Sequence, residues 1–440
     1  MTKISLKAAL LAAPILIGAA GAANAAGFYL QEQSARGAGR AYSGEGADTG
    51  PDSLWWNPAS IGGQTGFSAS VNASAILPRG KVENVGTLIV RPGQAPAPVG
   101  GNQSAKNPIA NGLLPSGAIA YGLNDTIALG LSINSPYSFS TNYGSTDWVR
   151  YTADKTYLRT ADIAPSIAIH FTPGISIGAA VNVEYAFATL SNSLPNLSPL
   201  LPDGHQGLKG DGWNVGYSVG AQLHEGPLSI GLSYKSSVKH KLDGNVTTAG
   251  LISVPIAPGV IVPLANNNGT VATTATFRTP WQAIASVRFS VTPQITLNGQ
   301  IVRYGWAKFD AIRLGAPLNT AIPENYRNTW SFAGGVDYAI APLVTLRAGI
   351  QHDQSPTQNG QRDARVPDSD RWNFSGGGSF DLTKHIGVDA AVSYIAFKDA
   401  TIDRTTAAYA GTAVQTPILV NGRLDSAHAV VLSLGARVAF

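Results

Sequence analysis

The sequence contains no cysteine and few charged residues. Only 13% of its 440 residues are charged, whereas glycine, with 49 residues, and proline, with 27, are abundant. Without cysteine the chain has no disulfide and no thiolate metal site. So little charge is unusual for a soluble enzyme of this length. A net charge of +4 also provides no strongly basic face for nucleic acid.

Apart from its beginning, the sequence lacks an uninterrupted apolar run of the ~20 residues that a membrane-spanning helix needs. At the beginning, Lys3 and Lys7 precede an apolar run at 8–20, and Ala23-Asn24-Ala25 has the pattern of an export cleavage site. We expect the mature chain to start at Ala26, with 28 basic and 26 acidic residues. A helical membrane protein is excluded, whereas a secreted β protein and a transmembrane β-barrel remain.

Alternation of apolar with small or polar residues is the main signal from about residue 65 onward. In the last segment the even-numbered residues from Val430 to Phe440 are apolar, and the other face includes Ser433 and Arg437. In another segment Arg347 opposes an apolar face, and a lipid-facing arginine would cost about 2–4 kcal/mol. We therefore expect one face of each strand to contact lipid and the charged face to line a lumen.

Fourteen segments show this pattern, an even number as in bacterial single-chain barrels. They lie at 66–77, 116–123, 126–134, 161–171, 175–188, 212–223, 228–238, 280–291, 294–305, 329–340, 343–352, 371–382, 386–397 and 427–440. Tight links alternate with long ones, which is not required in a soluble sandwich. The sequence thus predicts an all-β fold, a transmembrane antiparallel barrel of about fourteen strands, with short turns in the periplasm and long loops outside.

The segment before these strands resembles the FadL family of outer-membrane fatty-acid and hydrocarbon transporters. The resemblance rests on Ala26-Gly27-Phe28, on the stretch Gly39-Arg40-Ala41-Tyr42-Ser43-Gly44-Glu45-Gly46-Ala47, and on Asn57-Pro58-Ala59. It extends to Val366-Pro367-Asp368-Ser369-Asp370-Arg371 and to 389–394. It implies a hatch of short helices inside the lumen. Asn57-Pro58-Ala59 also fits an ordinary capped helix start.

The pattern and the resemblance together predict three parts: a cleaved signal peptide at 1–25, a hatch at 26–65 and a barrel at 66–440. The resemblance implies a monomer in the bacterial outer membrane, surrounded by its lipid and lipopolysaccharide and inserted by the barrel assembly machinery. It implies transport of hydrophobic molecules, most simply long-chain fatty acids. Uptake of aromatic hydrocarbons or alkanes, and a general porin, remain alternatives.

Two long loops, 190–201 and 249–264, are unexpectedly apolar, and exposed apolar patches often mark binding sites. By resemblance they would form an outer groove that captures the ligand, although they could instead pack only against each other. The candidate ligand-binding residues in these loops are Leu194, Leu197, Leu200, Leu201, Leu251, Ile252, Val254 and Ile256.

Beyond the groove, the resemblance implies a deeper apolar pocket that the N-terminus reaches, and Phe28 and Leu30 are the matching residues. A fatty-acid carboxylate would need a cationic partner. The candidates near external strand ends are Arg150, Arg159, Arg303, Lys308 and Arg327. The alternative for each is a lumen ion pair with Asp162, Glu184, Asp310 or Asp337. The resemblance also implies lateral exit beside a kinked third strand, yet 127–133 shows no break.

The sequence contains no catalytic motif that would favour an enzyme over a carrier. The seven histidines are scattered, without metal-ligand spacing or a nucleophile elbow. Gly376-Gly377-Gly378 lacks the Lys-Ser/Thr of a phosphate-binding loop and lies within a strand segment. We therefore expect no enzyme activity, no cofactor and no metal.

Overall fold

The fold is described from a computed structural model that covers residues 27–172, 174–257 and 260–440, with the side chains of 172, 256, 257 and 260 left out. The expected signal peptide and Ala26 lie outside the described residues. No helix among the residues described is long and apolar enough to cross a membrane.

The described strands form a closed antiparallel barrel of fourteen strands, which confirms the predicted fold class. The wall closes where the first strand pairs with the last, from Ser68↔Ala439 to Asn84↔Gly422. The wall is formed by β1 (Gly66–Asn84), β5 (Gly112–Gly122), β6 (Ile127–Asn134), β8 (Lys155–Thr172), β9 (Ile175–Leu194), β10 (Gly204–Glu225), β11 with β12 (Leu228–Lys235, Lys239–Ala249), β15 with β16 (Gly269–Arg278, Gln282–Ser290), β17 (Ile295–Tyr304), β20 (Thr329–Ala341), β21 (Val344–Asp353), β22 (Arg371–Asp381), β23 (Ile386–Phe397) and β27 (Gly422–Ala439). Some wall strands are interrupted, and β11 with β12 and β15 with β16 each form one wall strand in two pieces.

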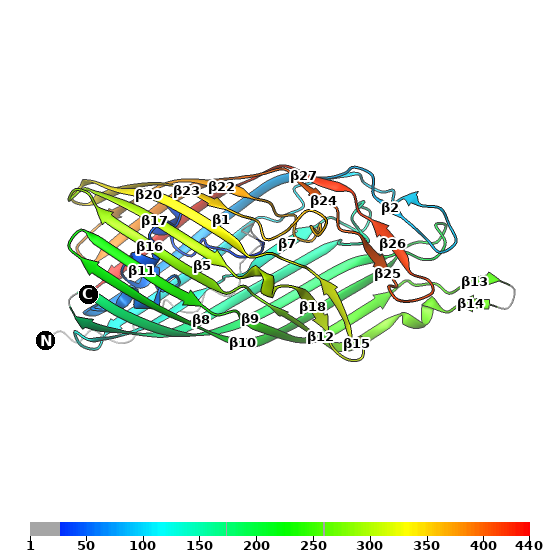
Figure 1. The fold of residues 1–440 in the computed structure, drawn as a ribbon, viewed down its shortest axis with the longest axis horizontal. Helices are drawn as coiled ribbons and strands as arrows, with labels where there is room; N and C mark the ends of the chain where they lie inside the picture. Colours follow the sequence, from blue (N-terminus) through cyan, green and yellow to red (C-terminus); the bar gives the residue numbers. More distant parts are fainter. Residues whose placement is uncertain (1–26, 173, 258–259) are drawn as a thin grey trace.

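Several strands extend well beyond their predicted ends. β9 and β10 pair from Leu223↔Ile175 to Gly204↔Leu194, so most of the predicted loop after residue 188 is sheet. Outside the hydrocarbon layer neither face of a strand must be apolar, so the alternation disappears while the backbone ladder continues. Figure 1 shows these long strands running toward the end opposite the C-terminus.

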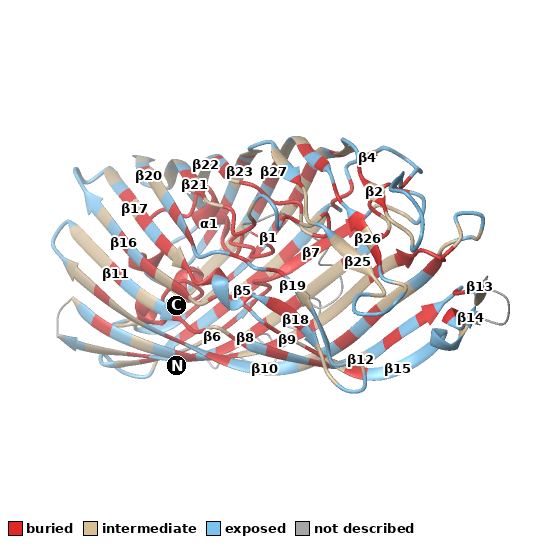
Figure 2. Cartoon of the chain, turned by 45° about the vertical axis from the view of Figure 1, so that its right-hand side comes forward, coloured by how far each residue is buried: buried red, intermediate tan, exposed pale blue. Residues whose placement is uncertain are grey.

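Buried and exposed residues alternate along the wall strands (Figure 2). Among the exposed side chains are two belts of aromatic residues, one near each end of an apolar band. Aromatic side chains favour the two membrane–water interfaces. Exposed leucine, isoleucine and valine side chains, among them Leu129, Ile301 and Leu434, occupy the band between them. The belt at the turn end includes Phe67, Tyr121, Phe289, Tyr338 and Phe440, and the other includes Trp213, Tyr217, Tyr234, Trp330 and Trp372.

The N-terminal segment, 27–64, lies inside the barrel and is almost entirely buried. It forms one helical turn and three 3₁₀ turns: α1 (Ala35–Ala38), η1 (Glu45–Ala47), η2 (Pro51–Ser53) and η3 (Pro58–Ile61). Asn57 caps η3, its side chain accepting a hydrogen bond from Ala59 N at 2.9 Å. The same side chain donates to Gly46 O at 2.7 Å, so the Asn-Pro-Ala motif both starts a turn and ties the segment together.

Short elements cover the end opposite the C-terminus. There β13 and β14 project farthest (Figure 1), and a separate four-stranded sheet contains β2, β3, β25 and β26. The short elements that the structure describes outside the main wall strands and the N-terminal segment are β2 (Leu88–Ile89), β3 (Ala97–Pro98), β4 (Ser104–Lys106), β7 (Ser138–Asn142), β13 (Val254–Ala257), β14 (Val260–Val262), η4 (Leu264–Asn267), η5 (Trp306–Lys308), β18 (Ala311–Leu314), β19 (Thr320–Pro323), β24 (Ala400–Ile402), β25 (Thr406–Ala408) and β26 (Thr416–Leu419).

Candidate functional site

An apolar cavity lies within the barrel, beside the N-terminal segment. Inward residues of β8, β9, β10, β12 and β15 form its wall, because alternate residues of each strand face the lumen. Its lining comprises Phe28, Phe139, Thr156, Tyr157, Leu158, Ala188, Leu190, Leu208, Gly210, Leu242, Ala275, Phe277, Phe309, Ile312, Glu324, Arg365 and Val366.

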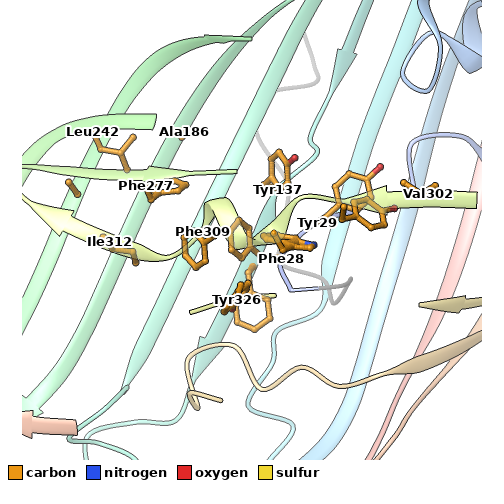
Figure 3. Close-up of a cluster of buried hydrophobic side chains, with 14 of the residues drawn as sticks. Phe28, Tyr29, Tyr137, Ala186, Leu242, Phe277, Val302, Phe309, Ile312 and Tyr326 are labelled. Atoms are coloured by element: carbon orange, nitrogen blue, oxygen red, sulfur yellow. The ribbon is translucent and has the colours of Figure 1, made fainter. Parts of the chain in front are cut away.

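Phe28 closes one side of this cavity through aromatic contacts (Figure 3). Its ring centroid lies 4.9 Å from that of Trp306, 5.0 Å from that of Phe309 and 5.9 Å from that of Tyr137, each in an edge-to-face arrangement. Such pairs add about 0.5–1.5 kcal/mol each beyond area burial. Leu30 points elsewhere, into a separate cluster with Ile76 and neighbouring side chains.

The cavity has two charged side chains in its lining, Arg365 and Glu324. Arg365 is buried and donates to Ser191 O at 3.2 Å and to Asn192 Oδ1 at 3.3 Å. It makes no ion pair with any residue that the structure describes. The strand pattern could not identify it, because it lies in the loop between β21 and β22, one residue before the Val366–Arg371 motif.

Glu324 is buried beside a second arginine. Arg404 Nη1 lies 3.5 Å from Glu324 Oε2 and 3.1 Å from Asp363 Oδ2. Burial raises the pKa of the Glu324 carboxyl to about 8, and Asp363 adds to the rise, while Arg404 and Arg365 oppose it. At neutral pH the Glu324 side chain is therefore mostly uncharged, and the positive charge of Arg365 is not cancelled.

An outer groove lies toward the loops and shares Arg365 with the cavity. Its apolar lining includes Leu194, Leu251 and Tyr409. Arg365 thus stands between the groove and the cavity.

The two apolar loops pack in part against each other. Leu194, Leu197 and Leu251 form one buried cluster with Leu264, and Val254 packs against it. Leu200, by contrast, is 92% exposed and Ile252 is 37% exposed, while Leu201 is half-buried. The side chain of Ile256 lies outside the described residues.

The five cationic candidates do not line the cavity. Arg159 stacks over the ring of Tyr157, and Arg303 stacks over that of Trp330 on the outward face of the wall. Arg150 pairs with Asp203, Arg327 with Asp370, and Lys308 lies in an outer cleft.

The alternative, that these cations form ion pairs with Asp162, Glu184, Asp310 or Asp337, is also wrong. Glu184 pairs with His240, Asp310 with Arg313 and Asp337 with Arg40, Arg288 and Arg347, and Asp162 accepts from Asn182.

The third strand of the wall is broken immediately after the predicted segment. β6 ends at Asn134 and β7 begins at Ser138, with Pro136 between them. On this side β5 is paired with β6 only from Gly117 onward. Proline cannot donate to the ladder, which accounts for an interruption here. The sequence-based view that the third strand is unbroken holds for 127–133 but not for the residues that follow.

The N-terminal segment supplies hydrogen bonds at this break. Leu30 N donates to Pro136 O at 2.7 Å, and Ser138 N donates to Phe28 O at 3.1 Å. Backbone groups at membrane depth need such partners, since lipid offers none. Tyr29 and Tyr137 form the bridge between them.

Gln33 fills the space beside the break. Its amide donates to Ser135 O at 3.1 Å, and its side-chain oxygen accepts from Asn134 Nδ2 at 3.2 Å and from Ser135 N at 3.3 Å. Its backbone oxygen accepts from Ser116 Oγ of β5 at 2.7 Å. Gln33 therefore bridges the second and third wall strands where their own ladder is missing.

Arg40 anchors the N-terminal segment to the opposite wall. Its guanidinium lies 2.5 Å from Glu45 Oε1, 2.5 Å from Asp48 Oδ2 and 3.1 Å from Asp337 Oδ2 of β20. Arg288 of β16 joins the network, 2.9 Å from Asp337 Oδ2. These ionic groups compensate one another within a buried site.

Close backbone packing also holds the N-terminal segment against the wall strands. A Cβ atom at Gly349 of β21 would overlap the backbone of Arg40, and one at Gly231 of β11 would overlap the backbone of Gly46. Glycine is required at these two wall positions because the N-terminal segment lies directly against the strands.

The sequence matches a known protein family over most of its length. Residues 16–440 match the family described as outer membrane protein transport protein, OMPP1/FadL/TodX. The chain belongs to this family.

Among the relatives of this family member is the long-chain fatty acid transport protein of Escherichia coli K12. It is 28% identical over 406 residues, which cover 84% of this chain and 87% of the relative. The crystal structure of a Pseudomonas aeruginosa FadL homologue superposes with a TM-score of 0.82 at 24% identity, covering 94% and 99% of the two chains. The Ralstonia pickettii toluene transporter TbuX gives 0.64 at 17% identity, covering 93% and 99%.

The family assigns this protein to the bacterial outer membrane and to the transport of hydrophobic substrates. Relatives include fatty-acid and toluene transporters, so family membership does not select between these substrate classes.

Proposed function

We propose that the protein carries long-chain fatty acids from the outer groove, past Arg365, into the apolar cavity. The observation that carries the proposal is the place of Arg365, a buried guanidinium without an ion-pair partner among the described residues, where groove and cavity meet. An apolar cavity suits an alkyl chain, and a guanidinium binds a carboxylate through paired hydrogen bonds.

The outer groove would capture the ligand first. Leu194 and Leu251 offer apolar surface there, and burying one such side chain against a ligand contributes about 1.5–3 kcal/mol. Leu200 and Ile252, being more exposed, would contact a ligand before it enters the groove.

The N-terminal segment would act as a hatch. Phe28 and Tyr29 stand between the cavity and the break in the third strand (Figure 3). Withdrawal of Phe28–Gln33 from the break would connect the cavity with the membrane beside β5 and β6. This path supports lateral exit of an apolar ligand into the bilayer, for which a passage through the polar turn end would be less suitable.

A neutral hydrocarbon is the second candidate, because most of the cavity lining is apolar. It would use the same cavity without needing Arg365. The two classes are therefore distinguished by how far affinity depends on this one side chain.

The decisive experiment compares Arg365→Gln with Arg303→Gln, whose guanidinium stacks on Trp330 outside the lumen. Oleate and toluene binding to the purified barrels would be measured by calorimetry in detergent. Loss of a hydrogen bond to a charged group, about 1.5–3 kcal/mol, predicts oleate affinity about 10–100-fold lower in Arg365→Gln. Toluene affinity and the Arg303→Gln variant should be unchanged. Equal oleate affinity in all three proteins would rule out the proposed carboxylate site.

A further inference from the structure

A basic cleft opens on the outer surface of the barrel, on the side of strands β12 and β15 that faces away from the ligand cavity. Lys239, Arg278 and Lys308 lie in it and are exposed. Leu242 and Ala275, on the other face of the same strands, line the cavity within, and Phe277 borders both the cavity and the cleft. The cleft is further bounded by Thr274, Thr276, Asp310 and Arg313.

The charges in this cleft are not balanced by the protein. Lys239 and Arg278 are directly cross-strand partners, an arrangement of like charges that destabilises a sheet. Neither they nor Lys308 forms an ion pair with a residue in the described parts of the chain. The carboxylate of Asp310 is engaged by Arg313, at 2.5 Å and 3.0 Å. Three cations are thus available to an anion from outside.

The cleft lies immediately beyond the aromatic belt at the loop end. Tyr234 stacks on Trp281 with centroids 6.2 Å apart, and Tyr234 is exposed on the wall. Arg278 precedes Trp281 by three residues, or about 10 Å of extended chain. Below the belt, Leu232 and Ile301 are exposed in the lipid-facing band. The three cations therefore stand at the level of the outer leaflet's headgroups.

We propose that this cleft binds the phosphorylated sugar headgroup of lipopolysaccharide, with the acyl chains against the apolar band below. A single carboxylate would compensate one cation, whereas a phosphate monoester carries about −1.5 to −2 charges and three acceptor oxygens. Threonine hydroxyls at 274 and 276 add hydrogen-bonding groups for sugar oxygens. Clusters of basic residues at the membrane surface recognise anionic headgroups in the same way. The assignment does not depend on the transported ligand.

The test replaces the three cations together, Lys239→Gln, Arg278→Gln and Lys308→Gln, in the full-length protein. The matched control carries Lys81→Gln, Lys106→Gln and Lys155→Gln, which removes the same charge from exposed residues outside the cleft. Native mass spectrometry in detergent would measure binding of bis-phosphorylated lipid A, with dephosphorylated lipid A, inorganic phosphate and palmitate as comparison probes. Heat-resistant gel mobility establishes that each barrel is folded.

The cleft variant should bind bis-phosphorylated lipid A at least tenfold more weakly, with the control within twofold of the wild type. Single Lys308→Gln, a loop substitution, should give a smaller loss and serves if the triple variant fails to fold. Equal losses in both triple variants would reduce the effect to general surface charge and overturn the proposal. So would equally tight binding of dephosphorylated lipid A, palmitate competing for the cleft, or binding of inorganic phosphate without lipid A.

Discussion

At the scale of single residues, the net charge of the side chains around Arg365, at the inner end of the groove, depends on the carboxyl of Glu324. Arg365 and Arg404 are cationic and Asp363 is anionic, so the group has a net positive charge while Glu324 is protonated. When Glu324 ionises, this net charge falls to zero. A bound fatty-acid carboxylate would then face a neutral group that includes a nearby like charge.

This balance predicts a pH-dependent affinity for fatty acids. Because the pKa of Glu324 is raised to about 8, the favourable charge is present at pH 6–7 and is lost as the pH rises through 8 toward 9. Oleate affinity should fall severalfold between pH 7 and pH 9, as measured by calorimetry. Toluene affinity should remain constant, since a neutral ligand does not respond to this charge.

The matched variant is Glu324→Gln, which keeps the shape of the side chain but cannot ionise. Its oleate affinity should be independent of pH over this range and equal to that of the wild type at pH 7. A fall in affinity of the same size in Glu324→Gln would assign the pH dependence to another group.

Gln33 provides a second prediction at this scale. Gln33→Ala removes the side-chain hydrogen bonds to Asn134 and Ser135, each worth about 1 kcal/mol net. Hydrogen exchange at residues 28–34 should accelerate about tenfold or more. The control is Gln64→Ala, which loses one bond, to Ala120 O. If exchange at 28–34 is unchanged, Gln33 does not hold the segment at the break.

The residues of the candidate site could be predicted from the sequence only in part. The resemblance brought Phe28 into consideration, and the structure places it in the cavity lining. Arg303 was a poor candidate for a reason already present in the sequence: it shares its strand face with Leu297 and Ile301, which are lipid-exposed. Arg365 and Glu324 could not be found, because loop residues carry no alternation and meet the cavity only through the tertiary fold.

At the scale of elements, the N-terminal segment is held by charge as well as by shape. Arg40 connects three carboxylates, one of them on the wall strand β20. Removing one partner of a buried ionic network costs about 3–5 kcal/mol, because the remaining charges are left uncompensated. The segment should therefore respond strongly to changes at this single side chain.

We expect deletion of residues 27–64 to convert a nearly silent barrel into an ion-conducting one in planar bilayers. A lumen of fourteen strands lies between filled eight-stranded barrels and open sixteen-stranded porins. Arg40→Ala should give brief openings, since the segment is loosened but present. A deletion variant that inserts normally yet conducts no more than the full-length protein would show that loops close the lumen instead.

The elements themselves were well predicted where lipid imposes a pattern. All fourteen predicted segments coincide with wall strands, and Asp389 and Arg347 lie on the inward faces assigned to them. The parts that were missed are the extensions such as β12 and β15. There the strands lie outside the lipid, so nothing imposes an alternation of apolar and polar residues. The break at Pro136 was missed because the alternation stops just before it.

At the scale of the whole molecule, the C-terminus and the short turns lie at one end, and the long loops at the other (Figure 1). Proteinase K added to intact cells should therefore cut near Leu200, which is 92% exposed, and in the loops near residues 90 and 255. The turns at 225–226 and 292–293 should be cut only after the outer membrane is opened. Cleavage at these turns in intact cells would mean that the barrel has the opposite orientation.

The interruption of the third strand after Asn134 also affects how a closed wall can open. A barrel is a ring in which each strand is joined to two neighbours, and separating β9 from β10 would sever a ladder from Leu223↔Ile175 to Gly204↔Leu194. In hydrocarbon such severed groups find no replacement partners. The second and third wall strands are paired on both sides of the break, from Gly117↔Ile133 to Gly122↔Ala128 and again at Ile109↔Thr141. At the break itself they are joined through Ser116 and Gln33, and Gln33 belongs to a segment that is not part of the ring. A window can thus open at the break without loss of a strand-to-strand bond, while the rest of the cylinder stays rigid.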